Sequence, residues 1–312
     1  MDIRLKMREG FRDLQGGLFG KVEKADVGGA AEEVQRAGGD MLGWADPFMP
    51  DDCMPAAVKA IAIDRIEKGL SAHYTHPVGD AELKAAIARK LARQNGLSVV
   101  PERNILITPG SDSGLLFAMM PFIEPGDEVL VVEPSFVCYT PITELTGGVP
   151  VPIATRAEDA FRLTPEQLKA AITPRTKLLI LPFPNNPTGA VMRRAHLEAI
   201  AGVLRGTDIM VLSDEIYAEL TYGDERHISF AEIDGMKERT ILVQGFSKSY
   251  AMTGWRLGYA AGPAPVIKQM TKIHQFSIMC APTTSQYAAV EALRNGDADI
   301  EEMRGQYDMR RR

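Results

Sequence analysis

Seven short, continuously apolar runs recur along this chain, and they limit its possible folds more than any other feature. Helical patterns lie between several of them, at residues 165–172 and 193–204, and another precedes the first run at residues 81–94. Because each run is continuous rather than alternating in hydrophobicity, it predicts a strand buried on both faces. The sequence therefore predicts an α/β fold, in which a large domain holds a seven-stranded, mostly parallel sheet flanked by helices. The runs lie at residues 104–108, 128–132, 149–153, 177–181, 208–212, 240–244 and 257–261.

Composition and charge narrow the class of protein and its partners. A net charge of -6 without a long basic run argues against nucleic acid and against an anionic membrane surface. Cys53, Cys138 and Cys280 lie far apart and the five histidines show no ligand spacing, so we predict neither a disulfide framework nor a metal site. No apolar run approaches the ~20 residues of a membrane span, and the N-terminus lacks the apolar core of a signal peptide. We therefore expect a cytoplasmic protein.

Lys248 is the most unusual polar residue of the chain, because it directly follows the predicted strand at residues 240–244. It stands between Ser247 and Ser249, and Arg256 comes eight residues later. A lysine amine that is desolvated, or that lies near another cation, becomes a nucleophile toward aldehydes and forms Schiff bases. Pyridoxal phosphate is an aldehyde that also carries a phosphate, which Arg256 would suit. Taken alone, Lys248 would be read as a solvated loop residue.

Ligands of open α/β sheets bind beyond the carboxyl ends of the strands, so the residues after the other runs are candidates as well. Gly110, Ser111 and Asp112 follow the first run and open an apolar helix. Backbone N–H groups at a helix start, together with the helix dipole, favour a phosphate. The alternative is that Ser111 or Asp112 only caps the helix.

Three further strand ends carry side chains that suit a planar, charged ring. Phe136 could stack on such a ring, although a core phenylalanine is the alternative. Asn186 lies in the turn at residues 184–189, which could also be a turn without chemistry. Asp214 ends an apolar run, where an unpaired buried carboxylate is costly, so it requires a nearby cation or serves as a helix cap.

The segment at residues 246–259, FSKSYAMTGWRLGY, resembles the lysine segment of the fold-type I aminotransferases of class I/II. The turn around Asn186 matches the N-x-P-T-G pattern of the same family. The resemblance covers roughly residues 40–310, and it implies pyridoxal 5'-phosphate as the cofactor.

The resemblance also implies a role for each candidate. Lys248 would hold the cofactor as a Schiff base and then act as general base and acid. Asp214 would pair with the protonated pyridine nitrogen, while Asn186 and Tyr217 would hydrogen-bond the phenolic oxygen. Phe136 would stack on the ring. The catalytic residues are then Lys248, Asp214 and Tyr217, and the remaining cofactor contacts fall to Gly110, Ser111, Asp112, Ser247 and Arg256.

These roles predict an enzyme that moves an amino group from an amino acid to a 2-oxo acid. A pyridoxal-phosphate C–S lyase or decarboxylase would use the same residues and stays open. A cofactor-binding regulatory module would carry a basic DNA-binding region, which residues 1–40 do not show. A nucleotide-binding protein would carry a glycine-rich phosphate fingerprint that the sequence lacks.

The resemblance further implies a homodimer and a division of the chain. Tyr74, in the segment at residues 73–79, would reach the phosphate of the neighbouring subunit. Residues 1–45 would form an N-terminal arm and part of a small domain, 46–295 the large cofactor-binding domain, and 296–312 the start of a helix toward a C-terminal small domain that is largely missing. Residues 42–47 place an alanine where the family often has glycine. The arginine that clamps the substrate carboxylate is assigned to none of Arg310, Arg311 and Arg312, so a catalytically impaired cofactor-binding fragment is a further alternative.

Overall fold

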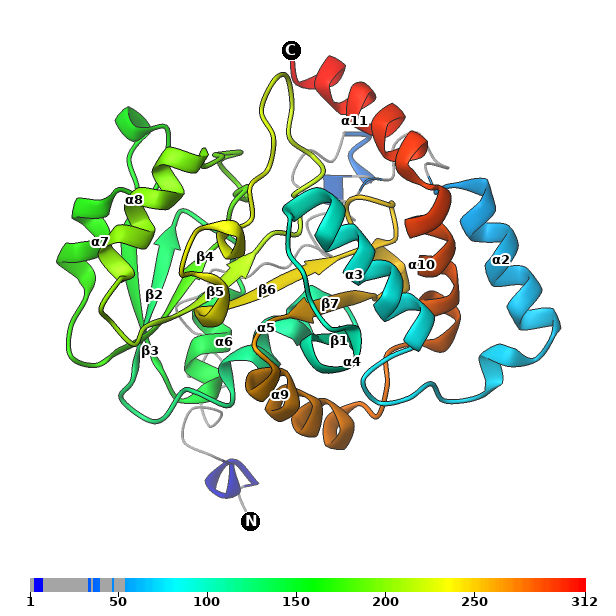
Figure 1. Cartoon of the computed structure of the whole chain (residues 1–312), viewed down its shortest axis with the longest axis horizontal. Coiled ribbons are helices and arrows are strands. Elements are labelled where there is room, and N and C mark those ends of the chain that lie inside the picture. The colour runs from blue at the N-terminus through cyan, green and yellow to red at the C-terminus, as the bar shows by residue number, and fades with distance from the viewer. Residues whose placement is uncertain (1–2, 8–32, 35, 40–46, 48–53) are drawn as a thin grey trace.

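The computed structural model describes residues 3–7, 33–34, 36–39, 47 and 54–312. One sheet of seven strands runs through the described part of the chain, in the order β1-β7-β6-β5-β4-β2-β3. Helices lie on both of its faces (Figure 1). The predicted α/β class and the mostly parallel sheet are confirmed. The strands are β1 Ile105–Thr108, β2 Glu128–Glu133, β3 Val149–Ala154, β4 Thr176–Leu181, β5 Met210–Asp214, β6 Thr240–Gly245 and β7 Gly258–Ala261.

Strand direction decides which residues meet at one edge of the sheet. Strands β2 to β6 pair in parallel, whereas β7 is antiparallel to both of its neighbours, β6 and β1. The carboxyl ends of β1, β2, β4, β5 and β6 therefore share one edge. The reversed β7 brings its amino end, and with it Arg256, to that same edge.

The edge strand β3 departs from the prediction of burial on both faces, since most of its residues are partly or fully exposed. The backbone N–H groups of Val149 and Thr155, at its two ends, donate to the neighbouring β2 side. Alternate N–H groups point the same way, so the intervening prolines, Pro150 and Pro152, lack their N–H groups on the free side of the strand. Proline is tolerated at such an edge because no ladder hydrogen bond is lost there.

Besides the sheet, the described part of the chain contains ten α-helices with defined bounds and several short 3-10 turns. The predicted helical patterns at residues 81–94, 165–172 and 193–204 correspond to α3, α7 and α8. The α-helices are α2 Ala56–Glu67, α3 Ala81–Asn95, α4 Pro101–Asn104, α5 Ser111–Met119, α6 Tyr139–Thr146, α7 Pro165–Ala171, α8 Arg194–Leu204, α9 Ala264–Ser277, α10 Thr283–Asn295 and α11 Asp297–Arg311. The 3-10 turns are η1 Ile3–Lys6, η4 Leu70–Ala72, η5 Ala157–Asp159, η6 Phe230–Glu232, η7 Lys237–Arg239 and η8 Thr253–Trp255. Within the described ranges, none of the helices combines the length and the apolar character that crossing a lipid bilayer demands.

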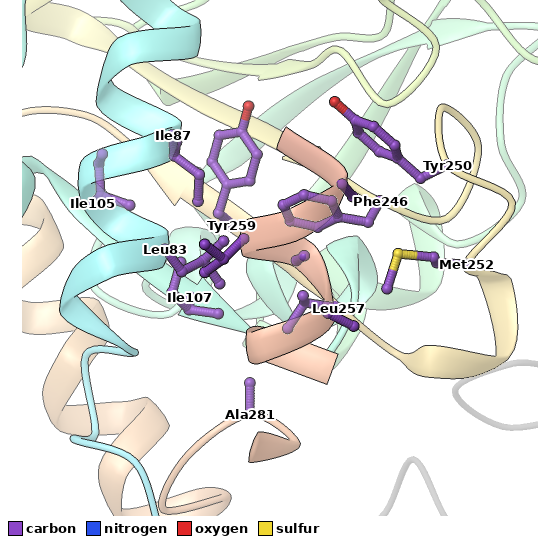
Figure 2. Packing of buried hydrophobic residues seen from close by; sticks show 14 of the residues in the cluster. Leu83, Ile87, Ile105, Ile107, Phe246, Tyr250, Met252, Leu257, Tyr259 and Ala281 are labelled. Carbon is purple, nitrogen blue, oxygen red and sulfur yellow. The ribbon is translucent and has the colours of Figure 1, made fainter. Parts of the chain in front are cut away.

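The core divides according to the two faces of the sheet. On one face, α3 and α10 pack over β1, β6 and β7, and α7 and α8 pack over β2, β4 and β5. On the other face, α5, α6 and α9 cover alternate residues of the same strands. In the first of these clusters, which also holds side chains of α3, the Phe246 ring lies 5.6 Å from the Tyr250 ring and 6.2 Å from the Tyr259 ring (Figure 2). Each fully buried aliphatic or aromatic side chain of this kind contributes about 1.5–3 kcal/mol to folding. The segment that follows β6 is therefore held to the core on both sides of Lys248.

Candidate active site

A cleft of about 500 Å³ opens where the strand ends meet. It collects nine of the candidate residues from six separate segments of the chain. These are Ser111, Asp112, Phe136, Asn186, Asp214, Tyr217, Ser247, Lys248 and Arg256. Further lining residues include Ser135, Tyr139 and Thr253, none of which the sequence singled out.

Lys248 lies in a short irregular segment whose neighbours are fixed. Phe246 and Tyr250 point into the core and their rings lie 5.6 Å apart. The Tyr250 N–H donates to the Phe246 carbonyl oxygen, which closes the chain into a turn at 3.2 Å. Lys248 stands in the middle of this turn, and its Nζ lies 5.9 Å from the centre of the Tyr217 ring. The amine is thus placed against an aromatic wall of the cleft.

Asp214 is buried at the end of β5, with 5% of its surface exposed. Tyr139 donates its hydroxyl to Oδ2 at 2.8 Å, and the Ile216 N–H donates to Oδ1 at 3.2 Å. Both donors are neutral, so the charge of the carboxylate is not balanced by them. Burial raises the pKa of Asp214 to about 6, against the lowering effect of these two hydrogen bonds. The backbone contact is the cap-like contact considered from sequence, whereas the tyrosine contact is not local.

The two adjacent asparagines of the turn after β4 have different surroundings. Asn185 is buried, and its Oδ1 accepts from the N–H and the hydroxyl of Thr188, which closes the turn. Asn186 lines the cleft, and its Nδ2 lies 3.4 Å from the Tyr217 hydroxyl. Burial, and next the negative charge of Asp214, raise the pKa of Tyr217 to about 12, so this phenol keeps its proton. Asn185 therefore serves to close the turn, whereas Asn186 faces the cleft.

The turn before α5 presents an uncapped helix start to the cleft. Gly110 is the N-cap residue, with φ of 85°, and no side chain caps the helix. The alternative that Ser111 or Asp112 serves as the cap is therefore wrong. Arg256 lies against this turn, with its Nη2 3.5 Å from Asp112 Oδ2. Backbone N–H groups and a guanidinium are thus together at one end of the cleft.

Two glycines allow this close approach. A Cβ at Gly110 would lie 2.4 Å from Arg256 Nη2, and the positive φ already disfavours any other residue. A Cβ at Gly258 would lie 2.8 Å from the carbonyl carbon of Gly110 and 2.9 Å from the Ser111 nitrogen. The start of β7 therefore packs directly on the turn that precedes α5.

Phe136 and Tyr139 form the wall above Asp214. Their ring centres lie 5.8 Å apart at 81°, an edge-to-face contact. Phe136 is half-buried, so it packs against the edge of the core and at the same time lines the cleft. Tyr139 begins α6 and turns its hydroxyl inward. Its position three residues after Phe136 is the only sequence signal that could have suggested it.

Tyr74 lies outside this cleft, and 80% of its surface is exposed. Its segment is held by α10, since the Thr283 hydroxyl donates to the His73 carbonyl oxygen and Gln286 donates to the Thr75 hydroxyl. Tyr74 itself is left pointing outward. The alanine that replaces the family's glycine, in the segment at residues 42–47, lies outside the described residues.

A second pocket of about 590 Å³ adjoins the first and shares Lys248 and Tyr217 with it. Its other wall comes from α11, through Tyr307 and Arg311. The Arg311 guanidinium lies 4.9 Å above the Tyr222 ring and pairs with Asp308. Lys248 thus stands between two connected spaces.

A mostly parallel sheet covered on both faces, with a lysine cleft at its carboxyl edge, is the arrangement of a fold-type I aminotransferase. The chain belongs to the aminotransferase class I and II family, whose model matches residues 39–312. It is 43% identical over 265 residues to an aspartate aminotransferase of Pyrococcus abyssi, covering 84% of this chain and 68% of that protein. It is 42% identical over 264 residues to aromatic-amino-acid aminotransferase 2 of Thermococcus litoralis, with the same two coverages.

Solved structures agree with this assignment. An aromatic aminotransferase from Pyrococcus horikoshii superposes with a TM-score of 0.83 at 43% identity, over 86% of this chain and 72% of that one. The N-succinyldiaminopimelate aminotransferase of Mycobacterium tuberculosis superposes with a TM-score of 0.89 at 32% identity, over 94% and 76%. The protein is therefore a pyridoxal-phosphate-dependent transaminase by family.

Proposed function

We propose that this protein transfers an amino group from an amino acid to a 2-oxo acid, and that it holds pyridoxal phosphate on Lys248. The observation that carries the proposal is the meeting of Lys248 and the buried Asp214 in one cleft. A lysine amine and a buried carboxylate are the two groups that a cofactor with an aldehyde and a basic ring nitrogen requires.

The cleft suits this cofactor at three points. Asp214 is a buried carboxylate whose protein donors are neutral, so a protonated ring nitrogen would supply the missing positive charge. The uncapped start of α5 and Arg256 offer N–H donors to a phosphate. Phe136 offers an aromatic face on the side of Tyr139. When bound, pyridoxal phosphate supplies an aldehyde carbon for the amine and a ring that accepts electrons from the substrate.

The residues of the chain then have distinct tasks. Lys248 Nζ would remove the α-proton of the substrate as a general base and would return it, as a general acid, to the former aldehyde carbon of the cofactor. The Asp214 carboxylate would hold a proton on the ring nitrogen. The Asn186 amide and the Tyr217 hydroxyl lie 3.4 Å apart, and both would donate to the phenolic oxygen of the cofactor. Ser111, Asp112, Ser247 and Arg256 line the cleft where the phosphate would bind, and Gly110 forms the turn against Arg256.

The proposal extends to assembly and location. We propose a homodimer in which Tyr74, 80% exposed and outside the cleft of its own subunit, reaches the phosphate of the neighbouring subunit, as the family resemblance implies. A cytoplasmic location and the division at residues 45 and 295 remain predictions. The names of the relatives include aspartate, aromatic and diaminopimelate aminotransferases, so an amine-donor screen should begin with acidic and aromatic amino acids.

Borohydride trapping tests the proposal directly. The purified protein is incubated with pyridoxal phosphate, reduced and digested, and the labelled peptide is identified by mass. We expect the label on Lys248 and its loss in Lys248→Ala. In parallel, a donor amino acid and a 2-oxo acid are supplied, and the appearance of a new amino acid is measured. Release of sulfide or carbon dioxide without a new amino acid would instead identify a lyase or a decarboxylase.

A further inference from the structure

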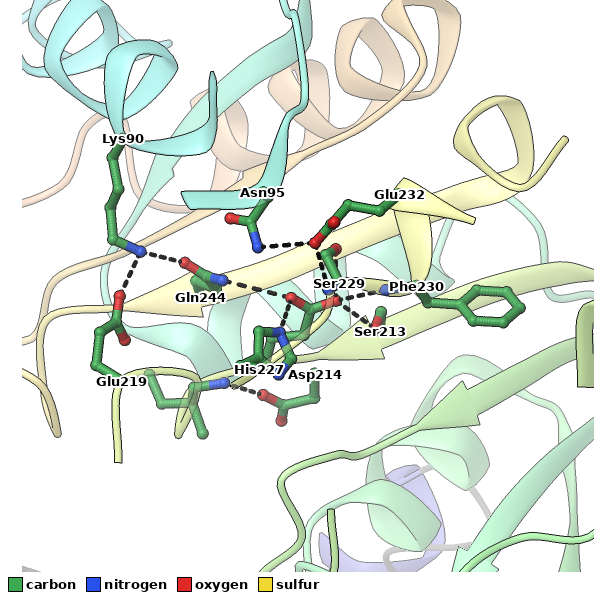
Figure 3. A network of polar contacts seen from close by, with 12 residues as sticks. Lys90, Asn95, Ser213, Asp214, Glu219, His227, Ser229, Phe230, Glu232 and Gln244 are labelled. Carbon is green, nitrogen blue, oxygen red and sulfur yellow. Dashed lines mark hydrogen bonds and ion pairs between the residues drawn. The ribbon is translucent and has the colours of Figure 1, made fainter. Parts of the chain in front are cut away.

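The residues that line the cleft have sequence neighbours that point the other way. Glu215 follows Asp214, Glu219 lies two residues after Tyr217, and Ser249 follows Lys248. Their side chains, all buried or nearly so, enter a polar network around Lys90, of which Figure 3 shows the part that contains Glu219 and Gln244. The network therefore reaches the segments of Asp214, Tyr217 and Lys248 from behind.

Lys90 is the centre of this network. It comes from α3, and only 7% of its surface is exposed. Its Nζ lies 2.5 Å from Glu219 Oε1 and donates to Gln244 Oε1 on β6 at 2.8 Å and to the Tyr259 hydroxyl on β7 at 3.4 Å. One ammonium group thus joins the segments that follow or form β5, β6 and β7.

Glu219 carries this connection to the lysine segment. Its second oxygen, Oε2, accepts the Ser249 hydroxyl at 2.6 Å. Ser249 is the next residue after Lys248, so the path from Lys90 to Lys248 passes through one carboxylate and one hydroxyl. Tyr217, whose ring lies beneath the Lys248 amine, is only two residues from Glu219.

Lys90 and Glu219 are both charged in this position. Burial works against each charge, but the opposite charge and the hydrogen bonds outweigh it, so the pKa of Lys90 is raised and that of Glu219 is lowered. A buried ion pair of this kind adds little to stability compared with apolar residues of similar size, and a role in fixing one geometry is the best-attested reason to keep one.

We propose that the Lys90–Glu219 ion pair, acting through Ser249, is a positioning device that sets the Lys248 amine against Tyr217 for reaction with the cofactor aldehyde. The inference rests on the proposed function of Lys248. Lys90, Glu219 and Ser249 do not line the cofactor cleft, so they act through the backbone of the segment and not by direct contact.

Ser249→Ala is the decisive variant, because it removes the tie to the lysine segment and leaves the ion pair in place. Cofactor-free protein is mixed with pyridoxal phosphate, and the rate constant for bond formation at Lys248 is followed by visible absorbance. We expect it to fall roughly tenfold, the equivalent of one hydrogen bond to a charged group. Glu219→Gln should have a similar or larger effect, and the double change Lys90→Met, Glu219→Leu covers the case in which an unpaired charge prevents folding.

Glu128→Gln is the matched control. Glu128 is also a buried carboxylate that accepts from a hydroxyl, that of Thr173, and from a cation, Arg175, but it lies at the amino end of β2. This variant should lower the melting temperature without changing the rate at Lys248.

Each outcome bears on a different claim. Equal rates in the wild type, Ser249→Ala and Glu219→Gln would overturn the positioning role while leaving the proposed function intact. A slowing in Glu128→Gln as large as that in Ser249→Ala would also overturn it, since a general loss of stability would explain both. If the wild type forms no trappable bond at Lys248, the proposed function fails and the positioning role fails with it.

Discussion

The Tyr139 hydroxyl donates a hydrogen bond of 2.8 Å to Oδ2 of Asp214 and joins the start of α6 to the end of β5. This bond favours the charged carboxylate, whereas burial, which raises the pKa of Asp214 to about 6, opposes it. In Tyr139→Phe we expect the pKa to rise further, by about one pH unit, because a hydrogen bond to a charged group is lost. A carbon-13 NMR titration of the cofactor-free protein measures this. An unchanged titration would show that the tyrosine is only a packing residue.

Asp214→Asn should change how stability depends on pH. The folded protein holds the Asp214 proton up to pH of about 6, while the ordinary value is 3.8. Between these values the folded state binds more protons than the unfolded state, so this stabilisation is present near pH 4 and is lost as the pH rises through 6. Over this pH range the proton contributes about 3 kcal/mol to the free energy of unfolding, and this contribution is lost at the upper end. We therefore expect the stability of the variant, relative to that of the wild type, to increase by up to that amount between pH 4 and pH 7.

Urea unfolding of the cofactor-free wild type and of Asp214→Asn, compared across this range, measures the gain. Parallel curves would contradict the burial of an uncompensated charge. In the presence of cofactor, the same variant and Asp214→Ala should fold but lose turnover.

Gly110→Ala should weaken phosphate binding more than it weakens the fold. The new Cβ would lie 2.4 Å from Arg256 Nη2 and push the guanidinium away from the start of α5. We expect at least a tenfold loss of affinity for pyridoxal phosphate, since charge-assisted bonds are lost, and little change for pyridoxal, which has no phosphate. Gly126→Ala is the control, because Gly126 has φ of 94° but no atom within 4 Å of its added Cβ. Equal losses for both aldehydes would argue that the turn does not hold the phosphate.

Mixing two inactive variants tests whether sites are shared between subunits. Tyr74→Ala and Lys248→Ala proteins are each expected to be impaired alone. If Tyr74 serves the neighbouring site, a mixed dimer has one site with both changes and one site with neither. Activity should then reappear after the two proteins are unfolded and refolded together, up to about a quarter of the wild-type value for random pairing at equal amounts. No recovery in a dimer of proven mixed composition would place Tyr74 and Lys248 in the same site or remove Tyr74 from it.

Local patterns in the sequence predicted well which strands, and which residues beyond their ends, form this site. The run at residues 240–244 predicted β6, and the position of Lys248 beyond it followed from the rule that ligands bind at strand ends. The hydrogen bonds of the buried groups around the site could not be predicted from local patterns, because they join residues that are far apart in the sequence. Tyr139 and Asp214 are 75 residues apart, and Lys90 and Gln244 are 154 apart. In sequence, Lys90 is one of several basic residues on a helix, and only the packing of α3 on the sheet shows that it is buried.

The exposure of β3 could not be predicted either, because its sequence has the same continuous apolar pattern as the buried strands. Residues 149–153 were expected to be covered on both faces, but β3 is the last strand of the sheet, so one neighbour is missing. Periodicity reports the spacing of side chains, not the order in which strands assemble.

The two prolines of β3 have a consequence for how copies of this molecule can meet. With Pro150 and Pro152 along the free side of β3, and with the Ile107 N–H of the opposite edge strand β1 already donating to Val78, neither border offers a complete ladder to an incoming chain. Growth of the sheet from molecule to molecule, the first step toward fibrous aggregates, is therefore disfavoured at both edges.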